Sequence, residues 1–351
     1  MQVNGLAKAQ REVGHEVHVI TATRLPSAAH EVLDDGITLH RLTFPLPADL
    51  PLHPRAQRVI SEALAQIKPD VVHVHVGSVS FFAWSGIQAA HKAHLPVLTT
   101  VHSMWGPLAK RMYGVANRAL GWSRWTALSA VSEAAAAPVR QAAQADVLVT
   151  GNGVDLSGWT PRDERHGRRF HVVSATRFAP RKRVLPLITI AANLHRLLGD
   201  NAPRFTIAGS GPALERARQR IEKAGLEGVV VLPGRLSRAA LADLYATGDV
   251  FVQLSVRESF GLAAIEARAA GLPVLGRAGT GFTEFITAGT DGYLERSDSA
   301  VQARLVQLLE HPEHLQEMRD FAATHSPRNA WSYALEQIEI GYHQAQAQRL
   351  R

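Results

Sequence analysis

The chain has 351 residues, of which 46% are hydrophobic and 20% charged, an ordinary balance for a globular protein long enough for two domains. It has no cysteine, which excludes disulfides and thiolate chemistry, and no apolar run of the ~18 residues that span a bilayer, so we expect a cytoplasmic protein. The net charge of +7 does not indicate a nucleic-acid partner, because most of the excess lies between Arg162 and Arg183 and no nucleic-acid-binding motif accompanies it.

Short apolar runs alternate with helical patterns along the chain, which is typical of parallel sheets covered by helices. In the first half the predicted strands are 16–21, 37–42, 71–76, 97–101 and 126–131. In the second half they are 170–176, 204–208, 229–232, 249–254 and 272–275. The polar, turn-rich stretch 152–165 predicts a linker. We therefore expect one domain over 1–152, a second over 153–328, and a final amphipathic helix within 329–351.

Two glutamates, Glu258 and Glu266, bracket the segment ESFGLAAIE between the strand 249–254 and a predicted helix over 262–270. Ser259 is the expected N-cap, and Gly261 would let the backbone approach a ligand closely. A helix N-terminus offers unpaired N–H groups and a partial positive charge, which suit a phosphate. The two carboxylates should lie on the order of 10 Å apart along the helix. A nucleotide sugar, with hydroxyls at both ends and a diphosphate between them, fits this spacing.

Further motifs follow the predicted strands of the second half. They are RFAPRK with Arg177 and Lys182, the turn IAGSGP at 207–212, LPGRL at 232–236, the ESFG segment, and GTGFTE at 279–284. In this order and spacing, from about residue 147 to the C-terminus, they resemble the C-terminal half of family 4 retaining glycosyltransferases of the GT-B fold. The resemblance implies an α/β protein of two Rossmann-like, doubly wound domains facing a central cleft, with the final helix returning to the first domain.

The resemblance also implies roles for the matching residues. Glu258 would bind hydroxyls of the transferred sugar, Glu266 the ribose hydroxyls, and the backbone after Glu258 the diphosphate. His102, at the end of the strand 97–101, would contact the transferred sugar. The implied donor-binding positions are Gly209, Arg235, Leu236, Ser259, Phe260, Gly261, Leu262 and Glu266.

Arg177 and Lys182 add an argument from charge. Cleavage of a sugar–diphosphate bond leaves a nucleoside diphosphate with growing negative charge. Metal-dependent transferases commonly neutralise this charge with an ion held by an Asp-X-Asp pair, and we find no such motif in a suitable loop. Two fixed cations and a helix N-terminus can do the same. We predict hexosyl transfer without a metal or a bound cofactor, catalysed by His102, Arg177, Lys182 and Glu258.

Two histidines in the first half allow a metal interpretation. His73 and His75 share one face of the strand 71–76, which would permit metal ligation. No third ligand is evident nearby, so we interpret them as packing or cleft-wall residues.

The stretch 104–125 combines an apolar helical stripe with basic residues and has no acidic one. The stripe comprises Trp105, Leu108, Met112, Val115, Ala119 and Trp122. It predicts either a helix packed on the first domain, which we favour, or a peripheral contact with an anionic membrane at its inner face.

The N-terminus departs from the family pattern. Residues 6–20 resemble the first helix and second strand of the family, so a first strand and a glycine-rich loop should precede them. We expect the chain as written to be incomplete at this end and impaired. Two alternatives therefore stay open beside the transferase, a truncated protein that only binds nucleotide sugar and a non-hydrolysing sugar-nucleotide 2-epimerase. UDP- and GDP-linked donors stay open, as do sugar, lipid-linked and small-molecule acceptors.

Overall fold

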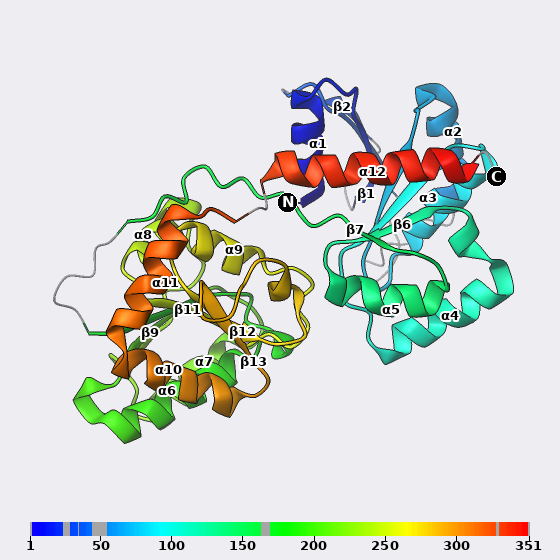
Figure 1. Cartoon of the computed structure of the whole chain (residues 1–351). Helices are drawn as coiled ribbons and strands as arrows, with labels where there is room; N and C mark the ends of the chain where they lie inside the picture. Colours follow the sequence, from blue (N-terminus) through cyan, green and yellow to red (C-terminus); the bar gives the residue numbers. More distant parts are fainter. Residues whose placement is uncertain are drawn as a thin grey trace. The chain divides into compact units, whose positions relative to one another are not determined.

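The structure is a computed structural model that describes residues 2–23, 29–33, 35–43, 55–162, 169–327 and 330–349. The chain divides into two compact units. The first comprises Met1–Asp155 with Asn329–Arg351, and the second Leu156–Arg328. Figure 1 shows helices beside the strands in each unit. The cleft expected between two facing domains stays a prediction.

The second unit contains one sheet of six parallel strands in the order β10-β9-β8-β11-β12-β13. The strands are β8 (His171–Ala175), β9 (Arg204–Ala208), β10 (Val230–Val231), β11 (Val250–Gln253), β12 (Val274–Arg277) and β13 (Gly292–Glu295). All five strands predicted for this half are confirmed, and β13 is an addition. The order reverses between β8 and β11, and ligands of such sheets bind outside the carboxyl ends of the strands at this point.

Helices cover both faces of this sheet, which explains why its strands are apolar runs without alternation. They are α6 (Val184–Leu198), α7 (Leu214–Lys223), α8 (Arg238–Ala246), α9 (Leu262–Ala269), α10 (Asp298–Glu310) and α11 (Pro312–Thr324). One hydrophobic cluster includes Leu187 and Ile188 of α6, and the other includes Ala264 and Ala267 of α9. Figure 1 shows the corresponding layers, α6, α7 and α10 on one side of the strands and α8 and α9 on the other.

The strands of the first unit form two sheets. Four parallel strands have the order β4 (Val72–Val76), β5 (Val97–Val101), β6 (Ala127–Ala130) and β7 (Leu148–Val149). The other sheet has the order β1 (His18–Thr23), β3 (Thr38–Thr43) and β2 (Ala29–Val32), with β2 antiparallel. All five predicted strands are present, and β2 and β7 are additions. Within the described residues no ladder joins β1 to β4, the place that the doubly wound order gives to the expected first strand.

The helices of the first unit are α1 (Gln2–Glu12), α2 (Ala56–Ile67), α3 (Phe81–Lys92), α4 (Pro107–Leu120), α5 (Glu133–Ala143) and the final helix α12 (Trp331–Arg349). Leu335, Ile338 and Tyr342 of α12 pack in one buried cluster with Leu6 of α1 and Leu98 of β5. The final helix therefore lies on the first unit, beside α1 (Figure 1).

The Trp331 ring fixes the start of α12 against two glycines of the first unit. A Cβ at Gly5 or Gly153 would lie 2.4 and 2.1 Å from atoms of this ring. Any larger side chain at either position would therefore displace the tryptophan.

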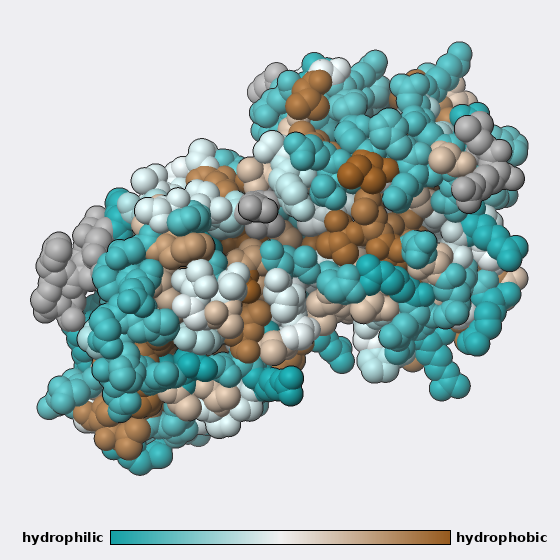
Figure 2. Space-filling model, in the orientation of Figure 1, coloured by the Kyte–Doolittle hydropathy of each residue, from teal (hydrophilic) through white to brown (hydrophobic). Residues whose placement is uncertain are grey.

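None of the helices in the described ranges is long and apolar enough to cross a bilayer. Figure 2 shows hydrophilic residues interspersed with hydrophobic ones on the face it presents.

Candidate functional site

A buried ion pair joins the loops that follow β8 and β11. Lys182 ends the 3-10 turn Pro180–Lys182 after β8, and its Nζ donates to Oε2 of Glu258 in the loop after β11. The same oxygen accepts a hydrogen bond of 2.9 Å from Nε2 of Gln253, the last residue of β11. The Lys182 and Glu258 side chains are only 13% and 11% exposed. The structure thus places these two predicted site residues together at the point where the strand order reverses.

Gln253 is a site residue that the sequence analysis missed. It is buried, and its Oε1 has no hydrogen-bond partner within the described part of the chain. An unpaired buried acceptor costs free energy unless a ligand or a water donates to it. The available signal was a glutamine within the strand segment DVFVQL, directly after three apolar residues.

The N-terminus of α9 has a different cap from the one predicted. The N-cap is Gly261, at φ 94°, and no side chain caps the helix, so the Ser259 N-cap is wrong. A left-handed φ is available to glycine without steric cost, so the N-cap lies two residues later than predicted, while the helix itself begins at Leu262 as predicted. Among the described residues, no backbone acceptor receives the N–H groups of Phe260 and Gly261. Two free donors thus precede Leu262, as an anion site at a helix N-terminus requires.

The motif at 279–284 packs against the ESFG segment and hydrogen-bonds to it. Phe282 is fully buried, and a Cβ at Gly261 or Gly276 would lie 2.2 and 2.4 Å from its ring. The N–H of Gly281 donates to the carbonyl of Glu258 at 2.8 Å. Because the ring occupies the space that two larger residues would need, this motif sets the position of the ESFG segment.

Gly209 lies where three loops meet. Its φ is 137°, and a Cβ there would lie 1.8 Å from the carbonyl oxygen of Thr176, after β8. Its N–H donates to the carbonyl of Gly234 at 2.7 Å, which places the exposed Arg235 and the half-buried Leu236 beside it. Close packing between loops alone is enough to require glycine at this position.

Arg177 and Glu266 differ in their surroundings. Arg177, two residues beyond β8, is exposed and makes no ion pair with a described residue. Glu266 lies on α9, and burial raises its pKa to about 7, an effect that Arg238 partly offsets. Glu266 therefore exchanges its proton near neutral pH.

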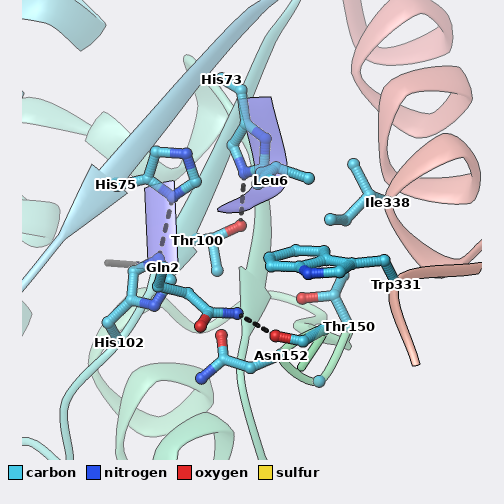
Figure 3. Close-up of a pocket in the computed structure, with 12 residues that line it drawn as sticks. Gln2, Leu6, His73, His75, Thr100, His102, Thr150, Asn152, Trp331 and Ile338 are labelled. Atoms are coloured by element: carbon cyan, nitrogen blue, oxygen red, sulfur yellow. Dashed lines mark hydrogen bonds between the residues drawn. The ribbon is translucent and has the colours of Figure 1, made fainter. Parts of the chain in front are cut away.

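In the first unit, His102 follows β5 and pairs with a second histidine. Its Nε2 lies 2.8 Å from Nδ1 of His75 on β4 (Figure 3). Burial lowers the pKa of His102 to about 4, and it holds the pKa of His75 well below its usual range, with smaller contributions from His73 and His102. Both rings are therefore neutral at pH 7.

His73 is held by a hydrogen-bond chain whose direction can be derived. Gln10 Nε2 donates to Tyr342 Oη at 2.6 Å, so the tyrosine hydrogen is free for His73 Nδ1, 3.0 Å away. His73 Nε2 then carries the hydrogen and donates to Thr100 Oγ1 at 2.6 Å. Both ring nitrogens are thus occupied, which agrees with the packing interpretation. No cluster of three His, Cys, Asp or Glu that could hold a metal ion occurs among the residues described.

Comparison with known proteins gives the family. Residues 1–158 match the family described as Glycosyltransferase Family 4, and residues 161–325 match Glycosyl transferases group 1. A GDP-mannose-dependent alpha-mannosyltransferase of Mycolicibacterium smegmatis is 31% identical over 287 residues, which cover 76% of this chain and 72% of that protein. The chain belongs to the family 4 glycosyltransferases. It transfers a sugar from a nucleotide-sugar donor.

Two further comparisons agree with this assignment. A protein of the same name from Mycobacterium tuberculosis is 28% identical, and the match covers 98% of this chain and 93% of that protein. The structure of HepE from Anabaena in complex with UDP has a TM-score of 0.71 at 20% identity, and covers 88% of this chain and 87% of that one. The fold is GT-B, with two units built on parallel sheets.

The buried pair gives a first prediction. Lys182→Met leaves the Glu258 carboxylate with Gln253 as its remaining partner, so the free energy of unfolding should fall by about 3–5 kcal/mol. Adding Glu258→Gln should restore most of the loss, because no buried charge is left. Urea denaturation at pH 7.5 measures both, with Arg181→Met at the exposed neighbour as the control. Equal stability of Lys182→Met and wild type would contradict the inferred pair.

Proposed function

We propose that the enzyme transfers a hexose-type sugar from a UDP- or GDP-sugar to an acceptor hydroxyl with retention of anomeric configuration and without a metal ion. The observation that carries this proposal is the arrangement at the switch point of the second unit. There a buried Lys182–Glu258 pair lies in sequence beside two free backbone N–H groups at the start of α9. The ion pair suits sugar hydroxyls, and the two N–H groups suit a diphosphate.

Each group would have a role that its contacts support. Lys182 has three N–H donors and gives one to Glu258, which leaves two for phosphate oxygens. Arg177 would add a second cation, able to bind phosphate bidentately. Glu258 and the unpaired Oε1 of Gln253 would accept hydrogen bonds from hydroxyls of the transferred sugar. His102 would contact the same sugar from the first unit.

The nucleoside end would bind along α9 and the loop after β10. Glu266 would accept hydrogen bonds from the ribose hydroxyls, while Arg235 and Leu236 would lie beside the base. Gly209 would bring its loop close to the donor.

Transfer would proceed on one face of the sugar. The bond between the anomeric carbon and the phosphate oxygen breaks, the bond to the acceptor oxygen forms on the same side, and the leaving diphosphate takes the acceptor proton. Lys182 and Gln253 both bond Oε2 of Glu258, which holds this carboxylate in one orientation. Charge on the departing diphosphate is then stabilised by the two cations and the helix N-terminus.

Turnover of a donor panel tests the reaction. With UDP- and GDP-linked hexoses, we expect release of the nucleoside diphosphate to continue in excess EDTA. Arg177→Ala and Lys182→Ala should each lose about 2–4 kcal/mol of transition-state stabilisation, roughly 30- to 1000-fold in rate. Activity lost with EDTA and restored by magnesium or manganese would overturn the metal-independent mechanism. A product with inverted configuration would overturn retention.

The pKa of Glu266 predicts a pH dependence of nucleotide binding. As pH rises through about 7, the free enzyme changes from the carboxylic acid to the carboxylate, the better acceptor for ribose hydroxyls. UDP or GDP should therefore bind more tightly at pH 8 than at pH 6. Glu266→Gln should flatten this dependence, and the titration of the diphosphate itself is common to both proteins. Calorimetry measures both affinities, and parallel pH profiles would exclude Glu266 from the ribose site.

A cytoplasmic location with peripheral membrane contact through residues 104–125 belongs to the same proposal. One face of α4 packs on α5, through Lys110 with Gln141 at 2.8 Å and Asn117 with the carbonyl of Ala143 at 2.6 Å. The opposite face exposes apolar side chains, Leu108 by 82%, Met112 by 46% and Val115 by 53%.

The two tryptophans predicted to extend this stripe do not belong to it. Trp105 and Trp122 are buried, with ring centroids 4.0 and 6.3 Å from that of Tyr113. The exposed stripe is therefore confined to α4, where Arg111 and Arg118 flank it and are exposed too. Because no acidic residue occurs in 104–125, an anionic bilayer complements this face better than a second copy of the same basic surface would.

Vesicle co-sedimentation tests the contact. The protein should bind vesicles that contain phosphatidylglycerol, and bind pure phosphatidylcholine much less. Leu108→Gln with Met112→Gln should reduce binding severalfold without changing the melting temperature, because both side chains are exposed. Leu197→Gln, at a leucine 64% exposed on α6, is the matched control. Equal loss in the control, or no preference for anionic lipid, would refute the contact.

A further inference from the structure

The pocket-lining histidines of the first unit form an ordered series. His73 and His75 are two residues apart on β4, with ring centroids 4.2 Å apart, and the His75 and His102 centroids are 5.0 Å apart. Figure 3 shows His75 between the other two rings, with its hydrogen bond directed to His102. Only His102 lies at a strand end, and we assigned it to the sugar.

We propose that His75 is a positioning residue for His102, and that its hydrogen bond fixes both the ring plane and the tautomer that His102 presents to the transferred sugar. The inference rests on the proposed function of His102, and nothing in the family comparison assigns His75 a role.

The argument starts from the hydrogen count. A neutral imidazole has one N–H donor and one bare nitrogen. Because burial keeps both rings neutral at pH 7, the contact between His75 Nδ1 and His102 Nε2 holds one hydrogen. If His75 donates it, the hydrogen of His102 is on Nδ1. If His102 donates it, Nδ1 is bare. The tautomers of the two rings are therefore coupled.

This coupling leaves His102 a single nitrogen, Nδ1, for a ligand. The backbone of His102 is fixed as well, since its N–H donates to the carbonyl of Val76 at 2.8 Å. A ring held at Cα and at Nε2 cannot rotate to offer its other nitrogen. A donor sugar would thus meet one nitrogen at a preset position, and little free energy would be needed to order the ring during binding.

His73 cannot take the place of His75. Its two nitrogens are hydrogen-bonded to Tyr342 and Thr100, and its ring lies against that of His75 at an interplanar angle of 34°. It therefore supports the plane of His75 without reaching His102. The series thus runs from Tyr342 on α12, through the two histidines of β4, to His102 after β5.

Three variants separate the hydrogen bond from the volume of the ring. His75→Phe keeps a ring but removes the bond. His75→Asn retains a polar atom near the position of Nδ1. His91→Phe, at an exposed histidine of α3 in the same unit, is the control. Protein labelled with 15N-histidine reports the His102 tautomer in long-range 1H–15N spectra at pH 7.5, with no donor present.

We expect one His102 tautomer in wild type, in His75→Asn and in His91→Phe, and averaged ring shifts in His75→Phe. With UDP-glucose or GDP-mannose, whichever the enzyme turns over, kcat of His75→Phe should fall about tenfold, with KM changed less than threefold. His75→Asn should keep most of the rate. An unchanged His102 tautomer in His75→Phe, or an averaged tautomer with full kcat, would overturn the positioning role.

The two hypotheses fail in different ways. If wild type turned over no nucleotide sugar, the proposed function would fall, and the positioning role that rests on it would fall too. If wild type were active and His75→Phe were equally active, only the positioning role would fall.

Discussion

The site depends on one buried charge, the carboxylate of Glu258. A buried carboxylate is costly unless it is paired and hydrogen-bonded. Lys182 and Gln253 meet this requirement, and they come from the loop after β8 and from the end of β11, the two strands between which the sheet order reverses. The same contacts therefore offset the desolvation of Glu258 and fix the loop after β8 against the loop after β11. Phe282, wedged between two glycines, then sets where α9 begins and where its free N–H groups lie.

Much of this arrangement could be predicted from the sequence. All strands predicted in the second half are present. They could be recognised because strands of a parallel sheet that is covered on both faces appear in the sequence as continuous apolar runs. β7 and β13 are edge strands, and neither lies in an apolar run longer than three residues, so this signal is weak there. The predicted Ser259 N-cap was wrong because it relied on the preference of serine for N-cap positions. The chain instead enters the helix through Gly261 at a φ of 94°, which glycine allows. Both Lys182 and Glu258 were predicted as site residues, but their direct contact was not.

The features that sequence could not supply arise from residues far apart in the chain. Gln253 is defined as a site residue by its bonds to Glu258 and by its unpaired oxygen, neither of which a strand pattern contains. The pKa of Glu266 depends on burial under tertiary packing, so its value near neutrality is invisible in the segment ESFGLAAIE. The contact between His75 and His102 could not be found from the sequence, because the two residues lie 27 positions apart.

The two units use opposite electrostatics, and the proposed reaction gives a reason for the difference. In the second unit, cations and helix N–H groups suit a leaving group that gains negative charge. In the first unit, burial keeps His75 and His102 uncharged. Glycosyl transfer passes through a state in which the sugar ring gains positive charge. An imidazolium beside that ring would oppose the charge, whereas a neutral imidazole can hydrogen-bond a sugar hydroxyl without repulsion. Desolvation keeps the histidines uncharged, and the absence of an imidazolium charge beside the sugar would therefore favour the transfer step.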